Sequence, residues 1–503
     1  MIYDAIMFDS VTNTKIELYS LIAAHQEGIF SVHYFGDRLF LNYHQVTRAI
    51  LEIDKDLKEI DPEHGSLFFK AGKIKITNTK VNIDEYRRFL LKSSVPYQFI
   101  LECLQKEPIH VNDFCNQLNI SRSTLARKMQ PLTDYLKEHD LRITYTPFNI
   151  QGDEALIRHS IWILLWLGLR GNEWPILAVD KQEAKKLAQK TLVYSQEKNF
   201  IANSELLLFV GVVIARWNAG FFCRKKYQWD KIFSSSKGFN KFKMDFDFPS
   251  EEIEHNEHEQ VIFLSLLAPH YTTDSKDLVE LLICELYEKH SEEPYAIFTR
   301  ELMNYLTNEL FYNMLSAKEE RVILANILSI FYAVYTYSGT YPTIEELSGA
   351  NTHANRWIDT IQEKILAFYE QIHSIDKTIH DCFYEERHKI IPTLGNLLLP
   401  YYYFCDNQAK LRVAISMERN KTIQQRIKMF LSMQSFVELY DFNGQDAKDY
   451  DLVISTSTSV FKKFDVKEGF LWDANYGYQE IGMLFQILQN IWFRNNQFKN
   501  SYY

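Results

Sequence analysis

The sequence predicts a mainly α-helical protein of several domains that ends in a small α/β domain. Three observations predict it: an internal repeat of 79 residues, long stretches with helical spacing of apolar residues, and a switch to alternating strands and helices near residue 409. At 503 residues the chain is longer than one core usually serves, because domains average roughly 150 residues.

The repeat lies in the N-terminal part of the chain. A shift of 79 residues places Phe35 on Phe114 and Arg48 on Arg127 without a gap. The other matched pairs include Val32 and Val111, Leu39 and Leu118, Val46 and Leu125, Ile50 and Met129, Ile53 and Leu132, and Leu57 and Leu136. Two copies of one three-helix pattern are hard to obtain by chance.

The second copy contains the segment LNISRSTLARKMQPL at residues 118–132, which follows the amphipathic stretch VNDFCNQLN. Asn119 and Ser121 lie at a short polar break, where the Ser121 hydroxyl can cap a new helix. A helix, a turn of three or four residues and a second helix make a helix-turn-helix, whose second helix enters the major groove of DNA. An ordinary pair of short helices remains the alternative.

Each copy is followed by a pair of strand-like segments. SLFFKAGKIKIT follows the first copy, with a hairpin turn expected at Ala71 and Gly72, and LRITYTPFNIQG follows the second. Three helices and a hairpin predict tandem winged helix-turn-helix domains. Lys70, Lys73, Lys75 and Lys80 in the first wing suit phosphate contacts, although a solvated lysine-rich hairpin would have the same composition.

The predicted DNA-binding residues lie on the exposed faces of the two second helices and on the first wing. They are Tyr43, His44, Gln45, Thr47 and Arg48; Ser121, Arg122, Ser123, Thr124, Arg127 and Lys128; and Lys70, Lys73 and Lys75.

The net charge of the chain is −10, which is unusual for a DNA-binding protein. Residues 1–150 contain 18 Lys or Arg against 19 Asp or Glu, a net charge of −1, so residues 151–503 carry −9. Because an acidic body repels nucleic acid, contact is expected in the N-terminal part, and the rest is expected to serve regulation and assembly.

Helical periodicity dominates residues 155–400. Two strongly apolar segments, at 205–222 and 321–341, are alike in outline and predict the first core helices of two related bundles. The run IWILLWLGL at 161–169 is too short to cross a bilayer and predicts a buried helix. For EEIEHNEHEQ at 251–260 the favoured interpretation is an acidic, solvated loop or helix start, with a metal site as the alternative.

The period changes in the C-terminal part. KLRVAISM, SFVELYDF, DYDLVISTST and GFLWDAN are predicted strands, with the helix TIQQRIKMFLSM between the first two, which favours a parallel sheet. The loop after the first strand contains neither glycine nor cysteine, so a scaffold or dimerisation role is favoured over phosphate transfer. No motif typical of an enzyme, a cofactor site or a metal site is found, so no catalytic residue, cofactor or metal is expected. Six scattered cysteines and an N-terminus unlike a signal peptide predict a cytoplasmic protein with no membrane contact.

The order of these parts resembles the Mga family of Gram-positive transcriptional regulators. At residue level the resemblance lies in NYHQVTRAI, NISRSTLARKM and the GDE…IR segment, which contains Gly152, Asp153, Glu154, Ile157 and Arg158. It implies a global or virulence-type regulator that binds double-stranded promoter DNA and forms a homodimer or higher oligomer. It also implies middle domains similar to phosphotransferase-system regulation domains (PRDs) and a tail similar to an EIIB component. The expected domains are 1–80 and 81–153 (winged helix-turn-helix), 154–285 and 286–402 (PRD-like), and 403–503 (EIIB-like).

The sequence departs from the family's regulatory pattern at specific positions. Phe209 and Leu328 stand where related regulation domains usually carry a histidine, and Met417 and Glu418 stand where a catalytic EIIB has its cysteine. His270 and His388 are left as candidates for regulatory phosphorylation, with a phosphotransferase-system phosphocarrier as the partner they would need; each also fits an ordinary, partly buried histidine.

Two other functions compete with promoter binding. One is an RNA-binding antiterminator controlled by the same helical domains, although RNA modules usually display stacking aromatics on a sheet, and none is evident near the N-terminus. The other is a sugar-phosphotransfer component, which would need a phosphoacceptor in the tail.

Overall fold

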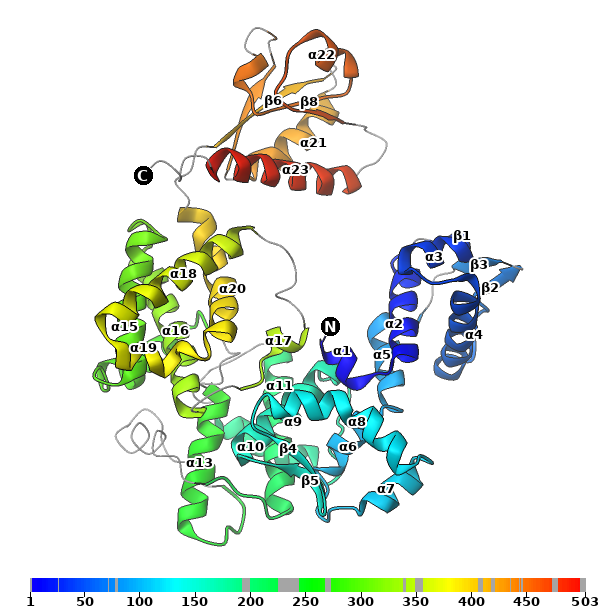
Figure 1. The fold of residues 1–503 in the computed structure, drawn as a ribbon, viewed down its shortest axis with the longest axis vertical. Coiled ribbons are helices and arrows are strands. Elements are labelled where there is room, and N and C mark those ends of the chain that lie inside the picture. The colour runs from blue at the N-terminus through cyan, green and yellow to red at the C-terminus, as the bar shows by residue number, and fades with distance from the viewer. Residues whose placement is uncertain are drawn as a thin grey trace. The chain divides into compact units, whose positions relative to one another are not determined.

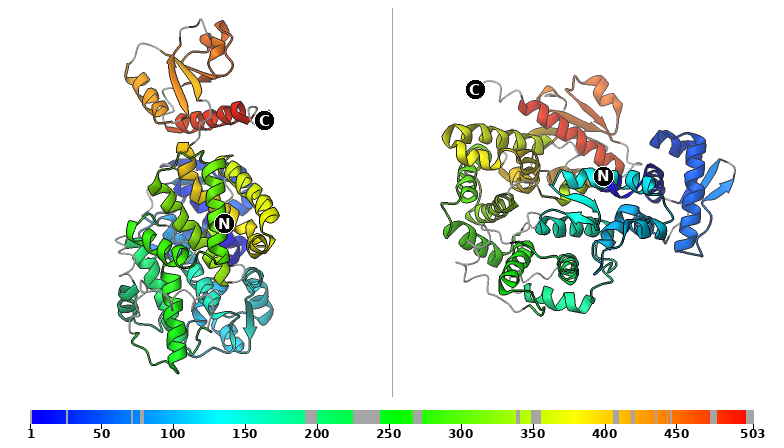
Figure 2. Two further views of the ribbon diagram at one scale, coloured as in Figure 1. Left: turned by 90° about the vertical axis from the view of Figure 1, so that its left-hand side faces the viewer. Right: turned by 60° about the horizontal axis from the view of Figure 1, so that its bottom comes forward.

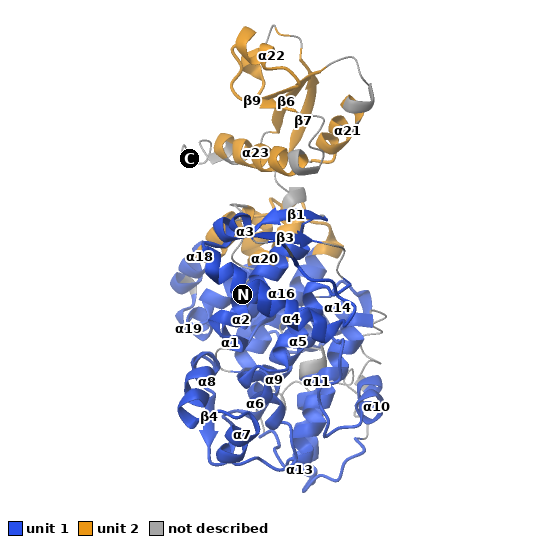
Figure 3. Cartoon of the chain, turned by 90° about the vertical axis from the view of Figure 1, so that its right-hand side faces the viewer, with its two compact units in different colours: residues 1–303, 320–353, 367–394 blue, residues 304–319, 354–366, 395–503 orange. Residues whose placement is uncertain are grey.

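The computed structural model describes residues 2–25, 27–70, 72–76, 80–191, 200–224, 244–266, 273–337, 341–348, 356–405, 410–417, 421–434, 436–442, 444, 447–472 and 478–497. The mainly helical character predicted from the sequence is confirmed for these residues. The chain divides into two compact units (Figure 3). Unit 1 comprises residues 1–303, 320–353 and 367–394, and unit 2 comprises 304–319, 354–366 and 395–503.

Unit 1 begins with the first copy of the repeat (Figure 1). Its elements are α1 (Ile2–Met7), α2 (Ser10–Ala23), β1 (Gly28–Ser31), α3 (Val32–Leu39), α4 (Tyr43–Ile60), β2 (Phe68–Lys70) and β3 (Lys73–Ile76). The three strands form an antiparallel sheet in the order β1-β3-β2. The predicted hairpin is therefore confirmed. Gly72 has φ +74°, which glycine adopts without strain, while Ala71 lies outside the described residues.

The second copy has the same succession of helices followed by a hairpin, but residues 107–110 form no strand equivalent to β1. Its elements are α5 (Ile83–Leu91), α6 (Val95–Glu102), α7 (Val111–Gln117), α8 (Arg122–Lys137), β4 (Arg142–Tyr145) and β5 (Phe148–Gln151). The two strands pair antiparallel, with Tyr145 opposite Phe148, as the sequence predicts.

The 79-residue repeat extends to backbone conformation. Phe40 and Asn119, which are 79 positions apart, both adopt a left-handed conformation, with φ of 54° and 52°. The next residue in each copy donates the same hydrogen bond, from Leu41 N to Gly36 O (2.9 Å) and from Ile120 N to Cys115 O (3.0 Å). Both turns therefore deliver the chain into the following helix in the same way.

The apolar positions matched by the repeat form the cores of both copies. Val46, Ile50 and Ile53 of α4 are fully buried, and so are the equivalent residues of α8, Leu125, Met129 and Leu132. The helical spacing read from the sequence therefore gives the buried face of each helix correctly.

Helices make up most of the chain between the second copy and the α/β domain. They are α9 (Glu154–Leu169), α10 (Lys181–Thr191), α11 (Phe200–Asn218), α13 (Glu251–Leu266), α14 (Lys276–Leu282), the π-helix η1 (Ile283–Glu288), α15 (Pro294–Glu309), α16 (Ala317–Tyr337), α17 (Ile344–Ser348), α18 (Arg356–Ile375), α19 (Lys377–Tyr384) and α20 (Arg387–Cys405). In α9, every residue from Ala155 to Trp166 is buried, which confirms the predicted buried helix.

Helix α11 is the one described helix that is long and apolar enough to cross a membrane. Within its most apolar window, 61% of the residues are buried inside the protein. Core helices of water-soluble proteins meet the same criterion, so the feature is weak evidence for a membrane span.

Unit 2 contains the α/β domain. Its elements are β6 (Leu411–Ser416), α21 (Lys421–Ser432), β7 (Val437–Asp441), the short 3₁₀ helix η3 (Ala447–Asp449), β8 (Leu452–Ser455), α22 (Thr458–Lys463), β9 (Gly469–Leu471) and α23 (Tyr478–Gln497). All neighbouring strands are parallel, in the order β7-β6-β8-β9, which confirms the predicted parallel sheet. Helix α23, red in both views of Figure 2, contacts β6. Met417 directly follows β6, and Glu418 lies outside the described residues.

Candidate nucleic-acid interface

The first of the two predicted recognition helices, α4, begins with a reciprocal cap. The Asn42 side chain accepts a hydrogen bond from Gln45 N (2.9 Å), and the Gln45 side chain accepts one from Asn42 N (2.9 Å). Such a capping box satisfies two backbone N–H groups that the helix itself leaves free. The side-chain oxygen of Gln45 thus supports the helix start, and its amide nitrogen is the part left for a ligand.

The second predicted recognition helix, α8, begins at the repeat-equivalent position. Ser121 Oγ accepts from Thr124 N (3.2 Å) and lies 2.9 Å from Ser123 Oγ and 3.0 Å from Thr124 Oγ1. The capping role predicted for Ser121 is confirmed. The hydroxyls of Ser123 and Thr124 both lie within hydrogen-bond distance of Ser121 Oγ, which orders the polar start of α8.

The structure places most of the predicted contact residues on the surface of α4 and α8. Tyr43, His44, Gln45, Arg48, Ser121, Arg122, Ser123 and Arg127 are exposed, and Thr124 and Lys128 are half-buried. Thr47 differs from the rest, because its hydroxyl is buried and has no hydrogen-bond partner among the described residues. Thr47 therefore does not offer its polar group to a ligand in this structure.

The predicted wing lysines also lie on the surface. Lys70, Lys73 and Lys75 are exposed on β2 and β3, while Ile74 and Ile76 between them are buried. A side chain at Gly72, in the turn between the strands, would contact the hydroxyl of Tyr43. The tip of this hairpin therefore adjoins the start of α4.

Two of the basic side chains on this surface form ion pairs with acidic residues of the protein. Arg48 Nε lies 3.1 Å from Glu52 Oε1, one turn along α4, and Lys128 Nζ lies 3.0 Å from Asp9 Oδ2, at the start of α2. Partial burial opposes ionisation of Asp9, but hydrogen bonds from Thr12 and Lys128 outweigh it and lower the pKa of its carboxyl. Asp9 is therefore charged at neutral pH, and it joins the first helix-turn-helix unit to the second.

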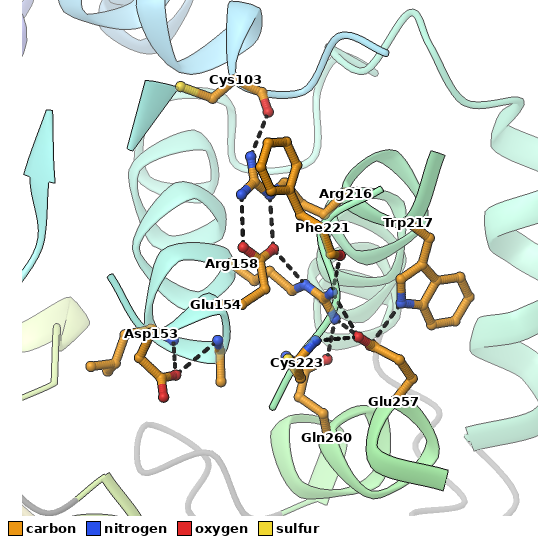
Figure 4. A network of polar contacts seen from close by, with 12 residues as sticks. Cys103, Asp153, Glu154, Arg158, Arg216, Trp217, Phe221, Cys223, Glu257 and Gln260 are labelled. Carbon is orange, nitrogen blue, oxygen red and sulfur yellow. Dashed lines mark hydrogen bonds and ion pairs between the residues drawn. The ribbon is translucent and has the colours of Figure 1, made fainter. Parts of the chain in front are cut away.

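Behind this surface, the GDE…IR segment builds a buried network of charges at the start of α9 (Figure 4). The Asp153 carboxylate caps α9 by accepting from Ala155 N (2.9 Å) and Leu156 N (3.2 Å). Glu154 then accepts from Arg216 Nη2 (2.7 Å) and Arg158 Nε (3.0 Å). Burial opposes ionisation of Glu154, yet the hydrogen bond from Arg216 and the charges of both arginines lower the pKa of its carboxyl.

The network extends from α9 to both neighbouring parts of unit 1. On one side, Arg216 Nη1 in α11 donates to Cys103 O (3.0 Å) and to Asn149 Oδ1 (3.2 Å), both in the second copy of the repeat. On the other side, Arg158 pairs with Glu257 of α13. The second helix-turn-helix unit is therefore fixed to the helical part behind it by hydrogen bonds that are closed to solvent.

The segment EEIEHNEHEQ is a helix start, one of the two forms that the sequence favours, but only Glu251 and Glu252 are exposed. It starts helix α13, and residues 256–260 are buried. The expectation of a solvated segment failed because Glu257 has its counter-charge in Arg158, 99 residues earlier, while Glu259 has His255 Nε2 at 3.0 Å. Among the described residues, no group of three or more His, Cys, Asp or Glu is arranged to hold a metal ion.

The two candidate phosphorylation sites have different outcomes. His388 is exposed on the first turn of α20, where its Nδ1 lies 2.9 Å from Glu385 O. His270 lies outside the described residues.

A known protein family matches the second copy of the repeat together with Glu154 and Arg158 of the buried charge network. Residues 79–165 match the family model described as "Mga helix-turn-helix domain". The chain contains a Mga-family helix-turn-helix domain. The match covers α5 to α8, the β4-β5 hairpin and most of α9, including Glu154 and Arg158. No curated protein matches the chain.

A Mga helix-turn-helix domain indicates a DNA-binding transcriptional regulator. Sequence reasoning found the residues of this Mga domain that point outward, because caps and apolar spacing are local signals. It missed Asp9 and Glu257, whose partners are 119 and 99 residues away. The alternating acidic and histidine residues around Glu257 gave no local sign of burial.

Proposed function

We propose that this protein is a transcriptional regulator that binds promoter DNA through two N-terminal winged helix-turn-helix units. The observation that carries the proposal is the recurrence of one turn geometry, 79 residues apart, ahead of two capped helices with exposed polar starts. A recognition helix contacts base edges with its N-terminal residues, and these are the residues that both helices leave exposed.

The proposed recognition surface comprises the predicted residues of α4, α8 and the first wing, without Thr47. It carries arginine, lysine, hydroxyl and amide groups, the side chains that contact phosphates and bases. Behind it, we assign the helices of residues 154–402 to two PRD-like domains for regulation and the tail to an EIIB-like domain. In this proposal the protein acts in the cytoplasm as a dimer or higher oligomer, has no enzymatic activity, and regulates at a global or virulence level.

A charge placed on the recognition helices tests the proposal. His44 and Ser123 are repeat-equivalent, exposed, and in the first turns of α4 and α8. A carboxylate in the first turn stabilises a helix through its dipole, so His44→Glu and Ser123→Glu preserve the fold while repelling DNA. The control is Gln182→Glu, which adds the same charge to the exposed start of α10.

The measurement is a salt-titrated gel shift of the full-length protein on an A·T-rich promoter-like duplex, with hairpin RNA as competitor. We expect binding by wild type and Gln182→Glu, loss of binding in the two recognition-helix variants, and weak competition by RNA. Equal binding by all four proteins would overturn the proposal. Preferential binding of RNA would favour the antiterminator alternative.

A further inference from the structure

We propose that the space between α4 and α8, across the start of α2, receives one phosphodiester strand of duplex DNA, which the repeat-equivalent arginines Arg48 and Arg127 contact. This inference deepens the proposed function and rests on it. We call this space the inter-repeat groove.

Two cavities define the inter-repeat groove. One, of about 560 Å³, is lined by α1, the start of α2, the turn before α6, and Arg127, Lys128 and Pro131 of α8. The other, of about 340 Å³, is lined by α2 and by Gln45, Arg48 and Glu52 of α4. Both are lined by Ser10 and Val11, so they adjoin at the first turn of α2.

The repeat places the same side chain on both walls of the groove. Arg48 and Arg127 are 79 positions apart, and each is the sixth residue of its helix. Both are exposed. Each lies more than a turn beyond the start of its helix, which is the part that reads base edges. Arg127 lines the cavity that also includes residues of α1 and α2 from the first copy, and Arg48 lines the adjoining cavity within the first copy. Because neither arginine lies at the start of its helix, each is better placed to contact the phosphates of DNA than its base edges.

The charges in the groove favour a strand of phosphates. Its basic residues are Arg48, Arg127 and Lys128, against the carboxylates of Asp9 and Glu52. Glu52 pairs with Arg48 and Asp9 with Lys128, whereas Arg127 has no ion pair among the described residues. Arg127 can therefore bind a phosphate without breaking an ion pair. Arg48 and Lys128 can bind one when the phosphate replaces the carboxylates of Glu52 and Asp9.

Asp9 has a distinct place in this arrangement. It already caps α2 through Thr12 N (3.0 Å), so the end of that helix is not itself the anion site. Its carboxylate occupies, beside Lys128 Nζ, the position that a phosphate oxygen would take. Asp9→Asn keeps the capping oxygen, because asparagine caps as well as aspartate does, but it removes the competing charge.

The test is fluorescence anisotropy of the full-length protein across a range of KCl concentrations, on a promoter duplex and on a scrambled duplex of equal composition. The slope of log K against log salt is negative, and each phosphate contact adds roughly 0.9 to its magnitude. We expect Arg48→Ala and Arg127→Ala each to reduce the magnitude of the slope by about 1 and to weaken binding to both duplexes by the same factor. We expect Asp9→Asn to tighten binding to both duplexes and to increase the magnitude of the slope by about 1.

The control is Lys181→Ala, which removes one positive charge from the exposed start of α10 and should leave the slope unchanged. Loss confined to the promoter duplex would identify the arginines as base contacts and overturn the inference, as would unchanged slopes in the groove variants. In both cases wild-type binding would leave the proposed function standing. Absence of wild-type binding to either duplex would overturn the proposed function and the inference together.

Discussion

Arg158 and Glu257 meet in a buried ion pair although 99 residues separate them in the sequence. Arg158 Nη1 lies 2.5 Å from Glu257 Oε2, and Nη2 lies 3.0 Å from Oε1, a two-point contact that a lysine would not make. Glu257 also accepts hydrogen bonds from Trp217 Nε1 (2.7 Å) and Cys223 N (2.6 Å). The carboxylate thus joins α9, α11 and α13 (Figure 4).

The first prediction concerns this pair. Glu257→Gln should destabilise the protein by about 3 to 5 kcal/mol, because the buried Arg158 and Arg216 would then share one carboxylate, that of Glu154, which leaves one buried positive charge without compensation. Thermal unfolding followed by circular dichroism measures the effect. The matched control is Lys92→Ala, which breaks the exposed Lys92–Glu173 pair (3.1 Å) and should change little. Equal melting temperatures for Glu257→Gln and wild type would contradict the role assigned to the pair.

The second prediction concerns acid stability. Burial lowers the pKa of His159 to about 4, and its hydrogen bond to Pro342 O only partly opposes this. An unfolded histidine has a pKa near 6.5, so between about pH 6.5 and 4 only the unfolded chain takes up this proton. Stability is therefore complete above pH 6.5 and falls as the pH drops, by about 2 kcal/mol at pH 5 for this residue.

Melting temperatures measured from pH 7.5 to 4.5 test this sign. His159→Gln should lose part of the acid-induced decrease, whereas His388→Gln, at an exposed histidine, should follow wild type. His139, whose pKa burial and the Lys389 charge lower to about 3, should contribute a similar share of the decrease in both variants. A His159→Gln profile parallel to that of wild type would show that this histidine does not titrate on unfolding.

The features predicted correctly from the sequence are those that local physics determines. Three examples are the Ser121 cap, the buried positions of α4 and α8, and the parallel direction of β6, β7 and β8. Each follows from residues within one or two elements. The second copy of the repeat strengthens the helix-turn-helix prediction, because a local signal that occurs twice at one spacing is unlikely to be accidental.

The features that the sequence analysis missed depend on packing between distant segments. Strand β1 pairs with β3, more than 40 residues later, and its four residues are too few to show a period. The burial of Glu257 and the ion pair between Asp9 and Lys128 both require a partner from another helix. Thr47 is one of the predicted DNA-binding residues of α4, yet its hydroxyl is buried.

The last prediction concerns the first wing, where Lys70, Lys73 and Lys75 lie exposed beside the start of α4. Changing all three to Ala should reduce the magnitude of the slope of log K against log salt by about 2 to 3, because each lysine that neutralises a phosphate releases about one counterion. Affinity should fall on promoter and scrambled duplexes alike, since contacts to phosphate carry no sequence information. The matched control changes three exposed lysines of α10, Lys181, Lys185 and Lys186, and should leave the slope as in wild type. A triple wing variant with the wild-type slope would remove the wing from the DNA-binding surface and leave the two recognition helices as its only parts.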